Sequence, residues 1–223
     1  IRQPKHFKGH ILPYKGKTNE KFKYLMDKLN DDLNKKNLGA FYTPELYCKK
    51  ASELLRKAID RVPNGNDYII LDRCAGTGNL EAILTDEELS HCILSTYEYY
   101  EYKVLCERLA DKVRLIIPPI ETDETYDKGF VRNANALSKD YVYNELIQRY
   151  IQNDNCTIIL FENPPYAETT SIEHQKKNKS TKSSVWKKSF VVEEMKKEIK
   201  GQATNELGNA FIWSAFKYYL RQP

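Results

Sequence analysis

The sequence predicts an α/β fold in which helices flank a mostly parallel β-sheet. Three short apolar runs, at 68–71, 92–97 and 156–161, are each followed by a polar or glycine-containing segment. Such continuous runs are typical of strands that are buried on both faces, as in a parallel sheet. Because stretches of helical length and pattern lie between them, the sequence indicates repeated β-α-β units.

The N-terminal part is expected to contain two helices before the first strand. Residues 1–38 should form an irregular arm, rich in proline and glycine at its start, and then a helix in which apolar residues recur at helical spacing. A second helix should begin with Thr43 as N-cap and Pro44 in its first position, and end at about Asp60. Its buried stripe is predicted to be Tyr47, Ala51, Leu54, Leu55 and Ala58.

Two apolar runs compete for the third strand of the sheet. They lie at 113–117 and 130–131, separated by an acidic segment that contains prolines. We assign the strand to 129–133. The remaining helices are expected from about residue 79, from the second strand to about residue 111, and at 139–152, 189–200 and 204–220.

Composition and charge exclude several classes of protein. No stretch approaches the roughly 18 uninterrupted apolar residues of a membrane span, so a soluble, cytoplasmic protein without a membrane partner is expected. The five cysteines include no C-x-x-C pair, and His6 and His10 have no nearby cysteine or acidic ligand, which argues against disulfides and against a metal site. A net charge of +4 is too small for a general polycation, so affinity for nucleic acid must come from a local patch such as the lysine-rich segment 174–188.

A glycine-containing loop follows the first predicted strand. Gly76 and Gly78 allow the backbone to turn sharply and let a ligand approach where a Cβ would otherwise stand. The loop lacks the Lys-Ser/Thr ending of a P-loop and the third glycine of the dinucleotide fingerprint. Glu98, about twenty residues further on, is placed to accept hydrogen bonds from both ribose hydroxyls of an adenosine-containing cofactor. Together these features predict a nucleoside site at the carboxyl edge of the sheet.

The strand at 156–161 leads into the predicted catalytic group, Asn163, Pro164, Pro165 and Tyr166. Proline has no N–H and fixes the local backbone, so the carbonyl of Pro164 and the side-chain oxygen of Asn163 can both accept from one NH₂ group. Tyr166 can stack on a planar ring. The tetrapeptide therefore predicts an acceptor that carries a planar amino group.

These motifs, in this order, resemble those of the amino-group, adenine-specific DNA methyltransferases found in restriction–modification enzymes. The F-x-T-P segment of that family is matched at 41–44, its D-P-x-x-G-x-G loop at 72–78 and its [DNS]-P-P-[YFW] tetrapeptide at 163–166. The resemblance implies a Rossmann-like fold, S-adenosylmethionine as cofactor, and direct methyl transfer to the adenine amino nitrogen without a metal. It also implies cofactor-binding roles for Phe41, Tyr42, Thr43, Pro44, Asp72, Cys74, Ala75, Gly76, Thr77, Gly78, Glu98, Asn135 and Ala136.

Two residues depart from the pattern of this family. Arg73 stands where the family has proline, and we expect a modest change in the loop. Asn135 stands where the family has an aspartate that hydrogen-bonds the cofactor's adenine amino group; an amide oxygen also accepts, so weaker binding is expected. Since the chain starts at Ile1 and stops before further strands, residues 39–223 are expected to form a catalytic domain that is incomplete at its C-terminus.

The resemblance further implies a DNA partner. The substrate would be double-stranded DNA with the target adenine flipped out of the stack and lying on Tyr166. A target-recognition domain or subunit outside this chain would read the DNA sequence. Lysines that border the substrate entrance are expected to meet backbone phosphates; they are Lys176, Lys177, Lys179 and Lys182.

Other acceptors remain open at this point. A glutamine-side-chain methyltransferase of release factors carries the same tetrapeptide, because an amide NH₂ poses the same chemical problem. An RNA adenine methyltransferase is another alternative, as is a cytosine amino methyltransferase, which usually has serine at position 163. From a different class, the chain could be a catalytically inactive DNA-binding or specificity fragment. The 41–44 segment and the lysine-rich segment favour DNA.

Overall fold

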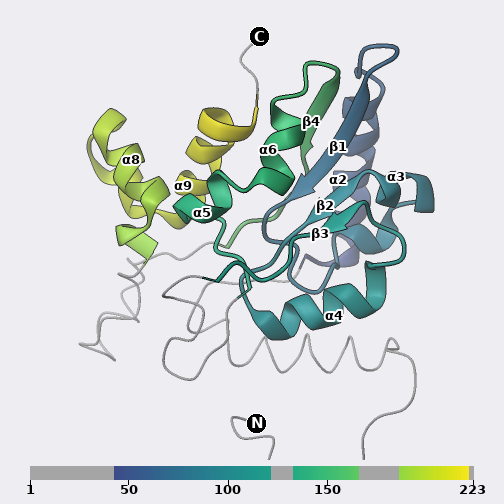
Figure 1. The fold of residues 1–223 in the computed structure, drawn as a ribbon, viewed down its shortest axis with the longest axis horizontal. Helices are drawn as coiled ribbons and strands as arrows, with labels where there is room; N and C mark the ends of the chain where they lie inside the picture. The colour runs from purple at the N-terminus through teal and green to yellow at the C-terminus, as the bar shows by residue number, and fades with distance from the viewer. Residues whose placement is uncertain (1–42, 122–132, 166–185, 221–223) are drawn as a thin grey trace, which may run out of the picture.

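A four-stranded parallel sheet forms the centre of the molecule. The computed structural model describes residues 43–121, 133–165 and 186–220 (Figure 1). The strands lie in the order β3-β2-β1-β4, and each neighbouring pair is parallel. The predicted α/β fold with a parallel sheet flanked by helices is confirmed. The strands are β1 (Asp67–Asp72), β2 (Cys92–Leu94), β3 (Leu115–Ile116) and β4 (Cys156–Leu160).

The central strand β1 separates two apolar layers. Successive side chains of a strand point to opposite faces of the sheet. Ile69 and Leu71 accordingly belong to one apolar cluster, whereas Ile70 belongs to the other. All three are at most 1% exposed. Both faces of the sheet are therefore covered, which explains why the sequence of this strand is apolar without alternation.

Helices cover both faces of the sheet (Figure 1). This layered arrangement is typical of α/β proteins with parallel strands. The helices that pack on the face of Ile70 are α2 (Glu45–Ile59), α3 (Asp86–Ser90) and α4 (Tyr99–Leu109). Those that pack on the opposite face are α5 (Lys139–Val142), α6 (Glu145–Ile151), α8 (Phe190–Glu198) and α9 (Leu207–Ser214).

The third strand does not lie where the sequence placed it. β3 pairs with β2 through Ile93 opposite Leu115, so the apolar run at 113–117 supplies the strand. Of the predicted segment 129–133, only Asn133 is described, and it is not part of a strand; 129–132 lie outside the described residues. The prediction was wrong because β3 directly follows the crossover helix α4, and such short β-α-β connections are strongly favoured over longer ones.

Several helices are shorter than predicted. The helix expected from residue 79 is a 3₁₀ turn, η2 (Glu81–Ile83), followed by α3, which begins with a capping box of Thr85 and Glu88. The helix expected at 139–152 is divided into α5 and α6, because Asn144 caps α6 by accepting from Leu146 N. The last predicted helix comprises η5 (Gln202–Asn205), α9 and a π-helical turn, η6 (Ala215–Tyr219). No helix among the described residues is long and apolar enough to cross a membrane.

Helix α2 buries only part of the predicted stripe, namely Leu55, with Ala51 and Ala58 partly buried beside it. Tyr47 and Leu54 are 65% and 67% exposed, whereas Cys48, Ser52 and Leu55 are buried. The prediction from apolar periodicity favoured large apolar residues. The small side chains of Cys48 and Ser52 instead lie on the side of α2 that packs closely against the rest of the protein. The predicted capping was also wrong, since Pro44 is the N-cap and no side chain caps this helix.

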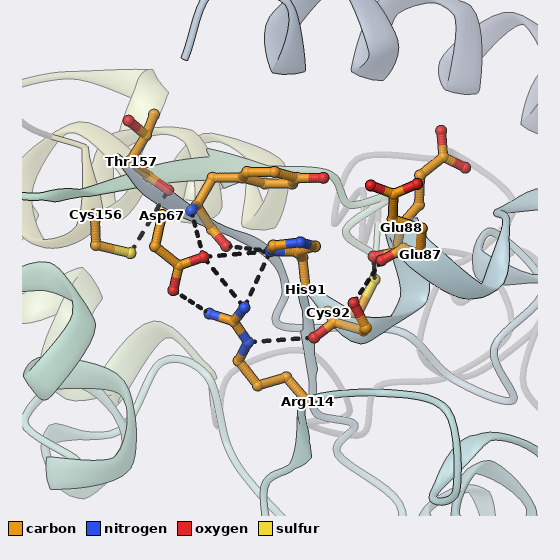
Figure 2. A network of polar contacts seen from close by, with 10 residues as sticks. Asp67, Glu87, Glu88, His91, Cys92, Arg114, Cys156 and Thr157 are labelled. Carbon is orange, nitrogen blue, oxygen red and sulfur yellow. Dashed lines mark hydrogen bonds and ion pairs between the residues drawn. The ribbon is translucent and has the colours of Figure 1, made fainter. Parts of the chain in front are cut away.

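A polar network joins the amino ends of three strands at the edge of the sheet opposite to the glycine loop (Figure 2). Arg114, just before β3, donates to both carboxylate oxygens of Asp67 at 2.6 and 3.2 Å, and to the carbonyl of Ser90 at 3.2 Å. His91, just before β2, stacks on Tyr68 with ring centroids 3.9 Å apart. The hydrogen bond from Arg114 holds the pKa of Asp67 below its usual range. This network has the features of a structural clamp, remote from the predicted site.

Candidate functional site

Three segments that carry predicted cofactor residues meet at the carboxyl edge of the sheet. The loop after β1 is bonded to the segment after β2, through Ser95 N to Asp72 O and Ala75 N to Ser95 O, both at 2.9 Å. The segment that starts at Asn133 runs alongside the same stretch, because Ala134 N donates to Thr96 O at 3.1 Å. Ligands of parallel α/β sheets bind at this edge. The sequence-predicted residues at 72–78, Glu98 and Asn135 therefore come from adjoining segments.

The glycine loop is shaped by its own backbone and by helix α4. Asp72 Oδ1 accepts from Cys74 N at 2.7 Å, and Gly78 N donates to Ala75 O at 2.9 Å. Gly76 and Gly78 have φ values of 57° and 79°, which side chains rarely tolerate. A Cβ on Gly78 would stand 2.9 Å from Leu109 Cδ1, so this glycine allows the loop to pack against α4. This packing accounts for a glycine at position 78, and the predicted approach of a ligand to the loop stays a prediction.

Two buried acids, Asp72 and Glu81, lie side by side beneath the loop. Each is 1% exposed. Burial and the neighbouring charge of Glu81 raise the pKa of Asp72 well above its usual range, and burial raises the pKa of Glu81 to about 7. Within the described residues no N–H or O–H group donates to either oxygen of Glu81, so the pair is satisfied when one acid keeps its proton and donates it to the other.

Glu98, Asn135 and Ala136 lie on the segments next to the glycine loop. Glu98 is the N-cap residue of α4 and is buried, four residues beyond the end of β2 rather than at its last position. The side-chain oxygen of Asn135 accepts from Leu137 N at 3.0 Å. The predicted bond from Asn135 to an adenine amino group stays a prediction. Ala136 is buried.

The predicted catalytic segment touches the predicted methionine-binding segment. Phe161 N continues the β4 ladder by donating to Leu71 O at 3.1 Å, which brings the following residues to the carboxyl edge. Asn163 Nδ2 donates to Thr43 Oγ1 at 2.9 Å, across 120 positions of sequence. Pro164 and Pro165 are half-buried beside it. Other predicted site residues lie outside the described residues: Phe41, Tyr42, Tyr166, Lys176, Lys177, Lys179 and Lys182.

Arg73 is a site residue whose importance the sequence analysis missed. Its side chain is 0% exposed and donates through Nε and Nη2 to Glu162 at 2.8 and 2.5 Å. Nη1 donates to Ser214 Oγ at 2.7 Å, and Nη2 also to Phe211 O at 3.0 Å. Burial opposes the charge of Arg73, but the hydrogen bonds and charge of Glu162 outweigh it and raise the pKa of Arg73. Far from altering the loop modestly, this residue connects it to β4 and α9. The sequence offered one signal of this role, which is a charged residue between an apolar strand and a glycine-containing loop.

The carboxylates of this region are not arranged as an open metal centre. Ligand atoms of Asp72, Cys74 and Glu162 lie within 4.8 Å of one another. Both oxygens of Glu162 are engaged by Arg73, however, and burial raises the pKa of the Cys74 thiol well above its usual range. A protonated thiol is a poor metal ligand.

Comparison with protein families assigns the chain. A family model for N-6 DNA methylases matches residues 18–200 and so includes the segments at 41–44, 72–78 and 163–166. The chain belongs to the N-6 DNA methylase family. The resemblance that the sequence motifs indicated is thereby confirmed, as is the coarser functional assignment to methyltransferases that act on adenine amino groups in DNA. Members of this family generally use S-adenosylmethionine. No curated protein and no solved structure matches this N-6 DNA methylase.

Proposed function

We propose that this N-6 DNA methylase transfers the methyl group of S-adenosylmethionine to the exocyclic amino nitrogen of adenine in DNA, at the carboxyl edge of its sheet. The observation that carries the proposal is the 2.9 Å hydrogen bond between Asn163 and Thr43. It brings together one motif expected beside the methionine part of the cofactor and one expected at the acceptor. Donor and acceptor sites on adjoining segments are what direct transfer needs.

Asn163 and Pro164 are the groups that we assign to the adenine amino group. Because Nδ2 of Asn163 donates to Thr43, the planar amide directs its Oδ1 away from Thr43. The Pro164 carbonyl is the second acceptor, and neither proline offers a competing N–H. Two acceptors for the two amino hydrogens favour a pyramidal nitrogen whose lone pair is directed at the methyl carbon. Such contacts strengthen as the bond forms and therefore lower the barrier.

The cofactor would be held by the segments around the glycine loop. S-adenosylmethionine supplies a methyl group on a sulfonium, which needs no metal or covalent enzyme intermediate. We assign Glu98 to the ribose hydroxyls and Asn135, with Ala136, to the adenine ring. The backbone of Cys74, Ala75, Gly76 and Thr77 would line the nucleoside, and Asp72 would support it. Thr43 and Pro44, with Phe41 and Tyr42, would cover the methionine part.

The DNA side of the site is proposed from the sequence. Tyr166 would stack on the flipped adenine, a contact that is worth on the order of 1–3 kcal/mol in stacking sites. The lysines at 176, 177, 179 and 182 would contact phosphates of double-stranded DNA. We further propose that the methylase acts in a restriction–modification system, with sequence recognition by a domain or subunit outside residues 39–223.

The test is Asn163→Ala in the intact protein, measured as transfer of tritiated methyl groups to DNA. We expect the rate to fall at least about 100-fold, while cofactor affinity measured by calorimetry changes no more than a few-fold. Asn153→Ala is the matched control, because Asn153 is an exposed amide in the turn before β4. Retained transfer by Asn163→Ala would remove Asn163 from the catalytic role.

The same assay separates the alternative acceptors. DNA, RNA and a glutamine-containing peptide are offered side by side to the wild-type protein. We expect label in DNA, on the amino nitrogen of adenine. Label confined to RNA, to peptide or to cytosine would replace the DNA adenine proposal by the corresponding alternative, and the absence of label from every acceptor would favour an inactive binding module.

A further inference from the structure

The ion pair between Arg73 and Glu162 links the two halves of the proposed site. Arg73 directly follows Asp72 in the cofactor loop, and Glu162 directly precedes Asn163. Among the described residues, the last backbone hydrogen bond between these segments runs from Phe161 N to Leu71 O. The side-chain pair lies immediately beyond that bond, where the two chains leave the sheet. It therefore continues the connection between β1 and β4 into the site itself.

The geometry of the pair fixes direction as well as distance. Nε and Nη2 of Arg73 meet the two oxygens of Glu162 at 2.8 and 2.5 Å, in the parallel, two-pronged arrangement that guanidinium and carboxylate groups favour. Because both groups are planar, a two-pronged contact restrains rotation of Glu162 about the axis that joins them. A residue held in this way restrains the backbone from which the next side chain, Asn163, extends.

The other side of the guanidinium is equally restrained. Nη1 donates to Ser214 Oγ and Nη2 to Phe211 O, both at the end of α9. The ring centroids of Phe211 and Tyr219 lie 5.3 and 4.7 Å from Arg73 Cζ. With its donors engaged and aromatic rings against it, the guanidinium has no second position available without breaking buried hydrogen bonds.

We propose that Arg73 and Glu162 are positioning residues, which hold Asn163 at the correct place relative to the cofactor loop. This inference rests on the proposed function of Asn163. A buried ion pair is not needed for stability as such, because apolar residues of similar volume commonly replace one without loss. Methyl transfer, in contrast, depends on the alignment of donor and acceptor, and a misplacement of about 1 Å can lower the rate about 100-fold.

The chain provides a matched control for this proposal. Arg114 and Asp67 form a second two-pronged pair, at the opposite edge of the sheet (Figure 2). That pair connects the start of β1 with the residue before β3, yet it contacts no residue of the proposed site. Arg73→Lys and Arg114→Lys each keep the charge but remove the guanidinium fork. The Arg114 pair is less buried than the Arg73 pair, so only folded variants are compared: if Arg73 served stability alone, folded Arg73→Lys would keep the kcat of wild type, as folded Arg114→Lys should.

The experiment compares both variants in the intact protein, at a temperature where circular dichroism shows each to be folded. We expect kcat of Arg73→Lys to fall about tenfold or more, with KM for S-adenosylmethionine within about threefold of wild type, and kcat of Arg114→Lys to stay within about twofold. Glu162→Gln, which keeps size and planarity, should reproduce the loss in kcat and serves if Arg73→Lys does not fold. A folded Arg73→Lys variant with wild-type kcat, or an equal loss in Arg114→Lys, would overturn the proposal.

Hydrogen exchange provides a readout that does not depend on activity. We expect the amides of Phe161, Glu162 and Asn163 to exchange faster in Arg73→Lys than in wild type, while those of β1 remain protected. Unchanged exchange at these three amides would also overturn the proposal. If the wild-type protein transferred no methyl group to any acceptor, the proposed function would fail, and the exchange measurement would still decide whether Arg73 holds the segment.

Discussion

Several charged residues are buried next to the glycine loop of this methylase. Asp72, Arg73 and Glu81 come from one short stretch of the chain and are almost completely excluded from water. The arginine is compensated by Glu162, whereas the two acids compensate each other only when they share a proton. Removal of charged groups from water is costly, so each arrangement has a measurable signature in stability or titration.

The acid pair predicts a dependence of stability on pH. The unfolded chain ionises Glu81 near 4.5, but the folded protein retains the proton to about pH 7, so the free energy of unfolding falls as the pH rises between these values. At about 1.4 kcal/mol for each pH unit, the loss amounts to about 3 kcal/mol. Glu81→Gln should remove this part of the pH dependence and leave the part that arises from the burial of Asp72. Urea unfolding at pH 5 and pH 8 measures the effect, and an equal pH dependence in both proteins would contradict it.

Sequence reasoning works where neighbouring residues carry the signal and fails where a distant partner decides. The place of Asn163 after a strand and that of Gly76 in a turn could be predicted from their neighbours, whereas their roles at the site stay predictions. The buried contacts of Arg73 could not be predicted, since its partners Glu162 and Ser214 lie 89 and 141 positions away. A buried arginine between a strand and a glycine loop looks unfavourable until those partners are known.

At the level of elements, the strength of the local signal decided what could be predicted. β1, β2 and β4 contribute apolar side chains to both faces of the sheet and were evident as apolar runs. β3 has only two residues, both partly exposed, and its apolarity did not distinguish it from the run at 130–131. Part of the buried face of α2 was mispredicted for a related reason: periodicity reports which residues are apolar, whereas packing also depends on which are small.

The contact between the glycine loop and α4 predicts an effect at the element scale. Gly78→Ala should destabilise the protein by about 2–3 kcal/mol. The alanine would have to adopt a φ of +79°, and its Cβ would stand 2.9 Å from Leu109 Cδ1. Gly65→Ala is the matched control: its φ is +88°, but nothing lies within 4 Å of the new Cβ. Its cost should be about 1 kcal/mol, from strain alone. Chemical denaturation compares the two, and equal costs would show that α4 accommodates the Cβ.

For the whole molecule, the cofactor should act as a stabilising ligand. A ligand that binds only the folded state at about 100 times its Kd adds about 2.7 kcal/mol. For a domain of this size we expect Tm to rise by roughly 5–10 °C with S-adenosylmethionine. Glu98→Ala should reduce this rise, measured as the difference between the Tm values of the same protein with and without the cofactor.

The control for that measurement is Glu87→Ala, which removes an exposed acid of α3. Its rise in Tm with cofactor should equal that of wild type. A full rise in Glu98→Ala would place the ribose elsewhere.

The strand order β3-β2-β1-β4 places the site at the point where the chain changes direction across the sheet. From β1 the chain proceeds outward to β2 and β3, and only afterwards returns to the other side of β1 as β4. Pairings over long sequence separations form slowly. We therefore expect β4 to pair with β1 later in folding than β2 does, so that the contact between Arg73 and Glu162 would form late. If the proposed function holds, the site would be complete only after that contact has formed.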